Sequence, residues 1–258
     1  MTDYNSKPII NLSEDFTHLS KAPIVEAVID IRITPKNILD EHAAFPFFKE
    51  RLSDYSKQEN MNAKSLQIEV GKERNAPVVK DLGFVGTKVS STSEPYIAQF
   101  YKEAFIFSRL SPYNEWKIFM AEAIRLWGLY CELVEPEEIL RIGVRFINKI
   151  DVIESQIELS NYYENAPDSI KNTVWPILNY MHKDTYQPTP IYIVNIIKTV
   201  KHISDKSIAG LILDIDVIMN KKFGNDLKKI TDHLIYMKWL KNKAFFNSIK
   251  PNIIERYK

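Results

Sequence analysis

The chain has 258 residues, of which 45% are hydrophobic and 12% aromatic, so it can bury a large core and global disorder is not expected. Its 34 lysines and arginines nearly balance 33 aspartates and glutamates, which leaves a net charge of +1. Proteins that bind nucleic-acid backbones usually carry a clear basic excess, so this balance argues against bulk nucleic-acid binding.

The first half of the chain predicts the order strand, helix, strand, strand, helix. Residues 22–33 alternate apolar and polar side chains, as a half-buried strand does. Residues 56–80 are polar and are expected to form a loop or a short strand. The other elements expected in this half are a helix at 34–55, strands at 82–91 and 95–110, and a helix at 111–134 capped by Ser111.

The second half predicts the same order of elements. They are a strand at 139–152, helical pieces within 155–182, strands at 190–203 and 206–219, and a closing helix at 225–249. Trp116, Trp127 and Trp239 fall on the apolar stripes of the two long helices. We therefore expect these three tryptophans in the core.

These elements predict one α+β domain over residues 1–258, made of two pseudo-repeated strand-helix-strand-strand-helix halves at about 22–134 and 138–250. Sequence identity between the halves is negligible, so the repeat is one of pattern only. We expect a mostly antiparallel sheet of about six strands, covered on one face by long helices. Three strands expected in this one sheet are 22–33, 141–150 and 211–219.

Charged residues gather on the polar side of three predicted strands. In "RIGVRFINKI" (141–150), counting in twos separates three cations from the apolar residues. The candidate binding residues are Glu26, Asp30, Arg32, Arg141, Arg145, Lys149, Asp214 and Asp216. They form either a solvated face with cross-strand ion pairs, each worth at most about 1 kcal/mol, or a groove for a ligand or partner protein.

Arg145 lies in the middle of its strand, where its guanidinium needs an acceptor. The acceptors expected within the chain are Glu26 or Asp30; otherwise the acceptor belongs to a ligand or partner. We expect Arg145 to pair with an acid, with Arg141 or Lys149 left free to contact the partner.

Asp214 and Asp216 also allow a catalytic interpretation. On a strand both carboxylates project the same way, roughly 6–7 Å apart, which suits a divalent cation. With Glu26 or Asp30 as a third acid, they would form the site of a metal-dependent enzyme acting on nucleotides or nucleic acid. No phosphate-binding glycine loop accompanies them, since the chain has only seven glycines.

Other catalytic patterns are absent from the sequence. The single cysteine, Cys131, excludes an internal disulfide and a cysteine-based metal cluster. The five histidines form no H-E-x-x-H spacing, and no serine lies in a G-x-S-x-G turn. We therefore assign no catalytic residue, metal or cofactor. Neither a signal-peptide pattern nor an apolar run of roughly 18 residues is found, so a cytoplasmic protein without membrane contact is expected.

Four segments stand in an order and at spacings that are familiar together. They are "LSKAPIVEAVIDIRI" (19–33), "FIFSRLSPYNEWKIFMAEAIRLW" (105–127), "LRIGVRFINKIDV" (140–152) and "WLKNKAFFNSIKPNIIERY" (239–257). The set resembles a sporadically distributed, uncharacterised prokaryotic protein family of about this length. Recurring positions in the pattern include Pro23, Glu26, Arg141, Arg145, Asn148, Phe245 and Phe246. The patchy distribution of that family implies mobile or accessory genes, such as defence or toxin–antitoxin-like loci.

From the sequence we expect a non-catalytic protein that recognises a partner through its charged sheet face. The expected partner is a protein or a small anionic ligand, and self-association into a homo-oligomer is left open. The metal-dependent enzyme that uses Asp214 and Asp216 is the alternative.

Overall fold

The computed structural model describes residues 10–67, 78–152, 157–166, 177, 179–203 and 206–258. Its strands are β1 (Ile24–Pro35), β2 (Lys57–Gln67), β3 (Val78–Ser90), β4 (Tyr96–Tyr101), β5 (Ala104–Leu110), β6 (Pro136–Asp151), β7 (Met181–Thr189), β8 (Tyr192–Ile203), β9 (Lys206–Met219) and β10 (Phe223–Gly224). Its helices are α1 (Glu41–Arg51), α2 (Trp116–Val134), α3 (Leu227–Ser248) and α4 (Pro251–Ile254), with the short 3-10 helices η1 (Leu159–Asn161) and η2 (Glu255–Tyr257).

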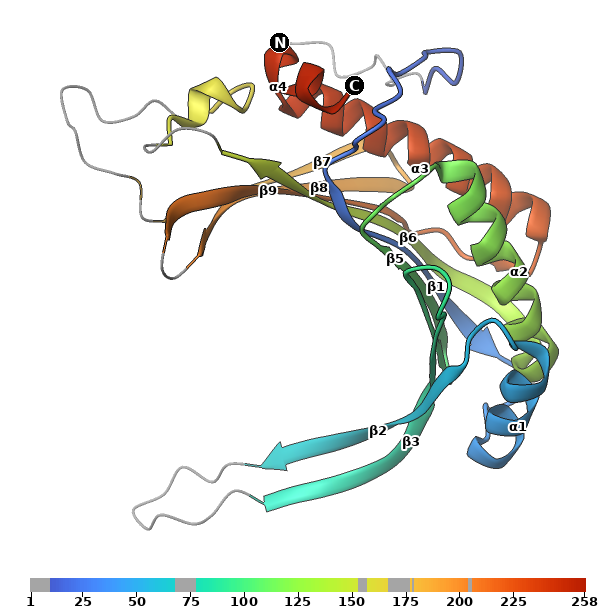
Figure 1. Cartoon of the computed structure of the whole chain (residues 1–258). Helices are drawn as coiled ribbons and strands as arrows, with labels where there is room; N and C mark the ends of the chain where they lie inside the picture. Colours follow the sequence, from blue (N-terminus) through green and yellow to red (C-terminus); the bar gives the residue numbers. More distant parts are fainter. Residues whose placement is uncertain (1–9, 68–77, 153–156, 167–176, 178, 204–205) are drawn as a thin grey trace.

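All ten described strands belong to one antiparallel sheet. Their order in space is β2-β3-β4-β5-β1-β6-β9-β8-β7, and the two-residue β10 pairs with β6. The sheet bends into a deep arc with α1, α2 and α3 on its outer, convex side (Figure 1). No helix described by the structure covers the inner, concave side.

The prediction of about six strands under long helices is wrong, because the described chain forms ten. The edge strands are not among the six predicted because "KQENMNAKSLQ" in β2 and "MHKDTYQPT" in β7 are polar and show no apolar alternation; for β2 the sequence predicts either a loop or a short strand. A polar edge also discourages pairing with other chains. Residues 95–110 form two strands, since the chain reverses between β4 and β5.

The helices are shorter than the sequence pattern predicted. The helix expected at 34–55 is reduced to α1, because β1 continues to Pro35 and the side chain of Asp40 caps α1 by accepting from the Ala43 N–H. α2 begins five residues after Ser111, so Ser111 does not cap it. Of the helical pieces expected within 155–182, the described residues contain only η1, while 155–156, 167–176 and 178 lie outside them. Within the described chain, no helix combines the length and the apolar character needed to cross a membrane.

The prediction that 22–33, 141–150 and 211–219 are strands of one sheet is confirmed. They belong to β1, β6 and β9, which are neighbours at the centre of the sheet. Phe146 pairs with Ala27 on one side and with Ile215 on the other. All three of these side chains are buried, so this row forms the middle of the core.

The order of the strands is similar, but not identical, on the two sides of the β1–β6 pair. β5, β4, β3 and β2 follow outward from β1, whereas β9, β8 and β7 follow outward from β6. The predicted strand-helix-strand-strand-helix order is wrong, since four strands, β2 to β5, lie between α1 and α2. A common origin of the two halves stays a prediction.

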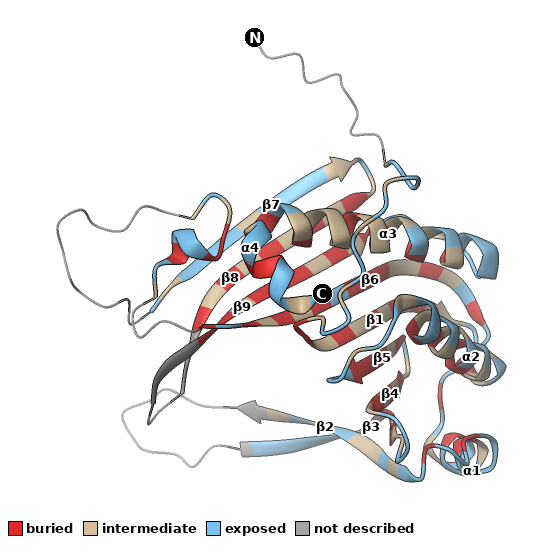
Figure 2. Ribbon diagram, turned by 45° about the horizontal axis from the view of Figure 1, so that its top comes forward, coloured by how far each residue is buried: buried red, intermediate tan, exposed pale blue. Residues whose placement is uncertain are grey.

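The core lies between the convex face of the sheet and the helices, where buried residues alternate along the central strands (Figure 2). Trp127 is 2% exposed, with its ring 5.9 Å from that of Phe105 and 5.7 Å from that of Tyr130, which confirms its core placement. Trp116 and Trp239 are only partly buried and pack against the core from its rim.

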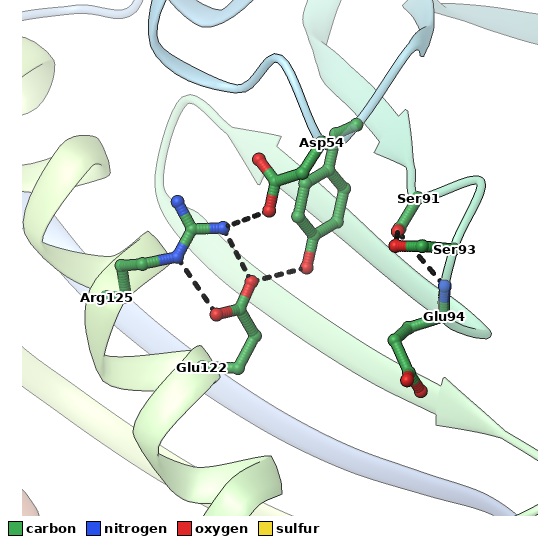
Figure 3. A network of polar contacts seen from close by, with 7 residues as sticks. Asp54, Ser91, Ser93, Glu94, Glu122 and Arg125 are labelled. Carbon is green, nitrogen blue, oxygen red and sulfur yellow. Dashed lines mark hydrogen bonds and ion pairs between the residues drawn. The ribbon is translucent and has the colours of Figure 1, made fainter.

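A polar network fastens the turn between α1 and β2 to α2 (Figure 3). Arg125 donates to Asp54 at 2.8 Å and to Glu122 at 2.7 Å, and the Tyr55 hydroxyl donates to Glu122 at 2.8 Å. Burial and the Glu122 carboxylate raise the pKa of Tyr55 above its ordinary value, so the phenol stays a donor. The network holds the polar end of the sheet against the helical layer.

We expect Trp127→Ala to lower the free energy of unfolding by about 3–5 kcal/mol, since it removes a large buried ring and leaves a cavity. Urea unfolding followed by circular dichroism measures the change. Ile118→Ala on the same helix is the matched control. Because Ile118 is 48% exposed, this change should leave the free energy of unfolding nearly unchanged. A melting temperature for Trp127→Ala within about 1 °C of the parent would show that this stripe is misassigned.

Candidate functional site

The eight charged residues singled out in the sequence lie together on the concave side of the sheet. We call them the charged face: Glu26, Asp30 and Arg32 on β1, Arg141, Arg145 and Lys149 on β6, and Asp214 and Asp216 on β9. Their neighbours in sequence, such as Ile29, Val144 and Ile215, are fully buried on the helix side. Because side chains alternate along a strand, the charged residues must project to the opposite side.

Arg145 is paired within the chain, although not with either acid expected from the sequence. Its Nε and Nη2 donate to the two carboxylate oxygens of Asp214, at 2.9 and 2.6 Å. In the register Arg145 lies opposite Asp216, so it reaches its partner along the diagonal. The two-point contact raises the pKa of Arg145 above its ordinary value, and Asp214 supplies most of that effect.

Asp30 is shared by two arginines. Arg141 donates through Nη1 to Asp30 Oδ2. On the same strand as Asp30, Arg32 Nε lies 3.2 Å from Oδ1, close enough for an ion pair but outside hydrogen-bond geometry. Arg141 is therefore not left free, contrary to one of the two options expected for it.

Two glycines that sequence reasoning missed make room for the long cations. A Cβ built on Gly143 would lie 3.2 Å from the Arg141 guanidinium, and one built on Gly210 would lie 3.0 Å from the Lys149 side chain. These cations therefore lie across bare backbone, and among the described residues Lys149 forms an ion pair only with Asp151, at 3.6 Å. The signal that could have found the two positions is a glycine in the middle of a strand pattern.

The remaining two acids have no direct partner of opposite charge among the described residues. Glu26 and Asp216 make no side-chain hydrogen bond or ion pair to the residues that the structure describes. Burial raises the pKa of Asp216, and the nearby Arg141 and Arg145 oppose that rise. The charged face therefore combines filled ion pairs with two carboxylates that contact no described cation.

The geometry does not favour the metal-dependent alternative. Arg145 donates a hydrogen bond to each carboxylate oxygen of Asp214, so a metal ion would have to compete with it for the same lone pairs. Among the described residues, no group of three or more histidine, cysteine, aspartate or glutamate side chains is placed to hold a metal ion. Arginines lie between the acids, as expected of ion pairing or of binding to an anion.

Comparison with known proteins leaves the site to be interpreted from its geometry. The sequence matches no protein-family model, and no curated protein matches it significantly. The resemblance to a sporadic prokaryotic family therefore stays a prediction.

Arg145→Met should lower the free energy of unfolding by about 1–3 kcal/mol, because it leaves the carboxylate of Asp214 buried without its partner. Arg141→Met should cost less than about 1 kcal/mol, since Asp30 keeps Arg32. Chemical unfolding measures both. In the double variant with Asp214→Asn, the loss from Arg145→Met should shrink. An equal cost with and without Asp214 would contradict the pairing.

Asp216→Asn should stabilise the protein at neutral pH. A raised folded-state pKa means that folding disfavours the ionised carboxylate, a penalty that starts as the pH rises past the ordinary aspartate pKa and is complete above the folded-state pKa. The gain should therefore be largest near about pH 7 and vanish below the ordinary aspartate pKa. Urea unfolding across that range measures it. Asp151→Asn, at a side chain 75% exposed, serves as control, and a gain that persists in acid would contradict the assignment.

Proposed function

We propose that the protein is a non-catalytic recognition protein whose charged face binds an acidic surface of a partner protein. The observation that carries this proposal is that two aspartates of the charged face are buried more deeply than two of its arginines. The side chains of Asp30 and Asp214 are 15% and 12% exposed, whereas those of Arg32 and Arg145 are 51% and 49% exposed. An approaching molecule therefore meets guanidinium groups first, and the acids lie beneath them.

The exposed cations keep donors for a second acceptor. Arg145 uses Nε and Nη2 on Asp214, so its Nη1 is not engaged by the described residues. Within the described part of the chain, the one ion pair of Lys149 is a 3.6 Å contact to an exposed carboxylate. Arginine forks of this kind are suited to carboxylates, which they bind in a plane with two donors.

The extent of the face supports a protein partner over a small ligand. From Arg141 to Lys149 the cations run for eight residues along β6, a distance of about 26 Å at the rise of an extended strand. Half-buried aliphatic side chains such as Val28, Ile147 and Ile218 separate the charges. An apolar surface divided by charged groups is typical of the centre and rim of protein–protein interfaces.

The sequence resemblance supplies a biological setting for this proposal. If the chain shares the genetic context of the family it resembles, it would be an accessory component of a mobile defence or toxin–antitoxin-like locus. The partner would then be another product of the same locus.

The test uses the full chain as bait in its native host, followed by reconstitution with the purified partner. We expect the Lys149→Glu and Arg32→Glu variants to weaken binding about tenfold or more, because each replaces an exposed cation by an acid. The affinity of the parent protein should fall as the salt concentration rises, because salt screens the attraction between exposed charges. Lys228→Glu, exposed on α3 on the other side of the sheet, is the matched control. Gly143→Ala adds a second arm, because it displaces Arg141 without changing any charge.

Cross-links or protection mapped to the charged face, with a partner contact rich in aspartate and glutamate, would support the proposal. Full binding by Lys149→Glu and Arg32→Glu would overturn it. So would a bound species that nuclease removes, or a self-association in which light scattering finds a second copy of the chain on this face.

A further inference from the structure

A pocket on the helix side of the sheet lies apart from the charged face. It has a volume of about 270 Å³ and is enclosed by the segment before β1, the start of α2 and the middle of α3. Phe16, Tyr113, Trp116, Lys241 and Phe246 contribute to its lining. Because β6 separates the two regions, whatever occupies this pocket is distinct from the partner proposed for the concave side.

Lys241 is the unusual group in this pocket. Its amine lies 4.1 Å from the centre of the Phe146 ring and makes no hydrogen bond or ion pair to the residues that the structure describes. Burial, with a smaller contribution from the nearby Lys238, lowers the pKa of Lys241 to about 7. A lysine amine in apolar surroundings is costly unless an anion accompanies it or it gives up its proton.

The walls of the pocket are aromatic and held in place from several directions. Phe16 stacks on Phe246 with ring centres 5.3 Å apart. An ion pair of 2.6 Å between Glu14 and Lys243 fastens the segment that carries Phe16 to α3. The aromatic side of the pocket is thus preformed, and the Lys241 amine lies beside it.

The charges that line the pocket are mostly cationic. Lys238 and Lys241 come from α3 and Lys117 from the start of α2. Glu115 is the one acid among the lining residues. The surroundings therefore favour an anion, and no arginine fork is present in the lining for a phosphate.

We propose that this pocket binds a small organic monocarboxylate, with its carboxylate at the Lys241 amine and its apolar body between Phe16, Trp116 and Phe246. A single negative charge neutralises the Lys241 ammonium, which has no acid partner among the described residues, and an apolar body of modest size matches the aromatic walls. Binding would draw a proton onto Lys241, because the carboxylate stabilises the ammonium form.

The test compares phenylacetate with its neutral analogue phenylacetamide on the full chain, by calorimetry and by the indole N–H resonance of Trp116 in NMR. We expect phenylacetate to shift that resonance and to bind at least about tenfold tighter than the amide. Its affinity should fall between about pH 6 and pH 9 as Lys241 loses its proton, while that of the amide should stay constant.

Lys241→Met keeps the apolar stem of the side chain and should abolish the preference for the carboxylate. Lys228→Met, on the exposed side of the same helix, is the matched control and should retain it. Dispersed indole resonances and an unchanged or higher melting temperature would show that the Lys241→Met protein is folded. Should that variant not fold, Lys238→Met should weaken phenylacetate binding and leave the amide unaffected.

Three results would overturn the proposal. They are equal affinity for phenylacetate and phenylacetamide, no shift of the Trp116 resonance at carboxylate concentrations up to about 20 mM, and retention of the preference by folded Lys241→Met.

Discussion

The structure depends on the burial of one face of the three central strands. β1, β6 and β9 place a continuous row of aliphatic and aromatic side chains, including Ala27, Phe146 and Ile215, under the helical layer. Because side chains alternate along a strand, this fixes every intervening residue on the concave side. A slip of the register by one residue would bury a row of charges, so packing on the convex side also positions the charged face.

On the charged face, opposite charges on the same and neighbouring strands compensate part of the acidic charge. Asp30 and Asp214 lie low on the face and are covered by arginines, an arrangement that leaves few buried acids unpaired. The exception is Asp216, whose ionised form the fold disfavours. Asp216 therefore lowers the stability of the fold at neutral pH.

β6 links the two proposed sites. Its residues alternate between them: Arg145 and Lys149 point to the concave side, while Phe146 lies under the Lys241 amine and Asn148 lines the pocket on the helix side. β6 is paired with β1 on one side and with β9 on the other, so one rigid strand contributes to both sites. The positions of the family-like sequence pattern, Arg141, Arg145, Asn148, Phe245 and Phe246, fall on both sides of this strand.

The sequence by itself determined the alternation of β1, β6 and β9, the two long amphipathic helices and the eight residues of the charged face. Each of these elements is buried on one side, and such burial produces a periodic pattern of apolar residues in the sequence. The sequence did not reveal the polar edge strands β2 and β7, which bury too little apolar surface to carry such a pattern. Only the tertiary structure decided that Arg145 pairs with Asp214 and not with Glu26 or Asp30, since the stagger and twist of neighbouring strands select the diagonal acid. It alone also brought Phe16, Trp116 and Lys241 around one pocket. Residues so far apart in the chain leave no local pattern, because they meet only when the helices pack on the sheet.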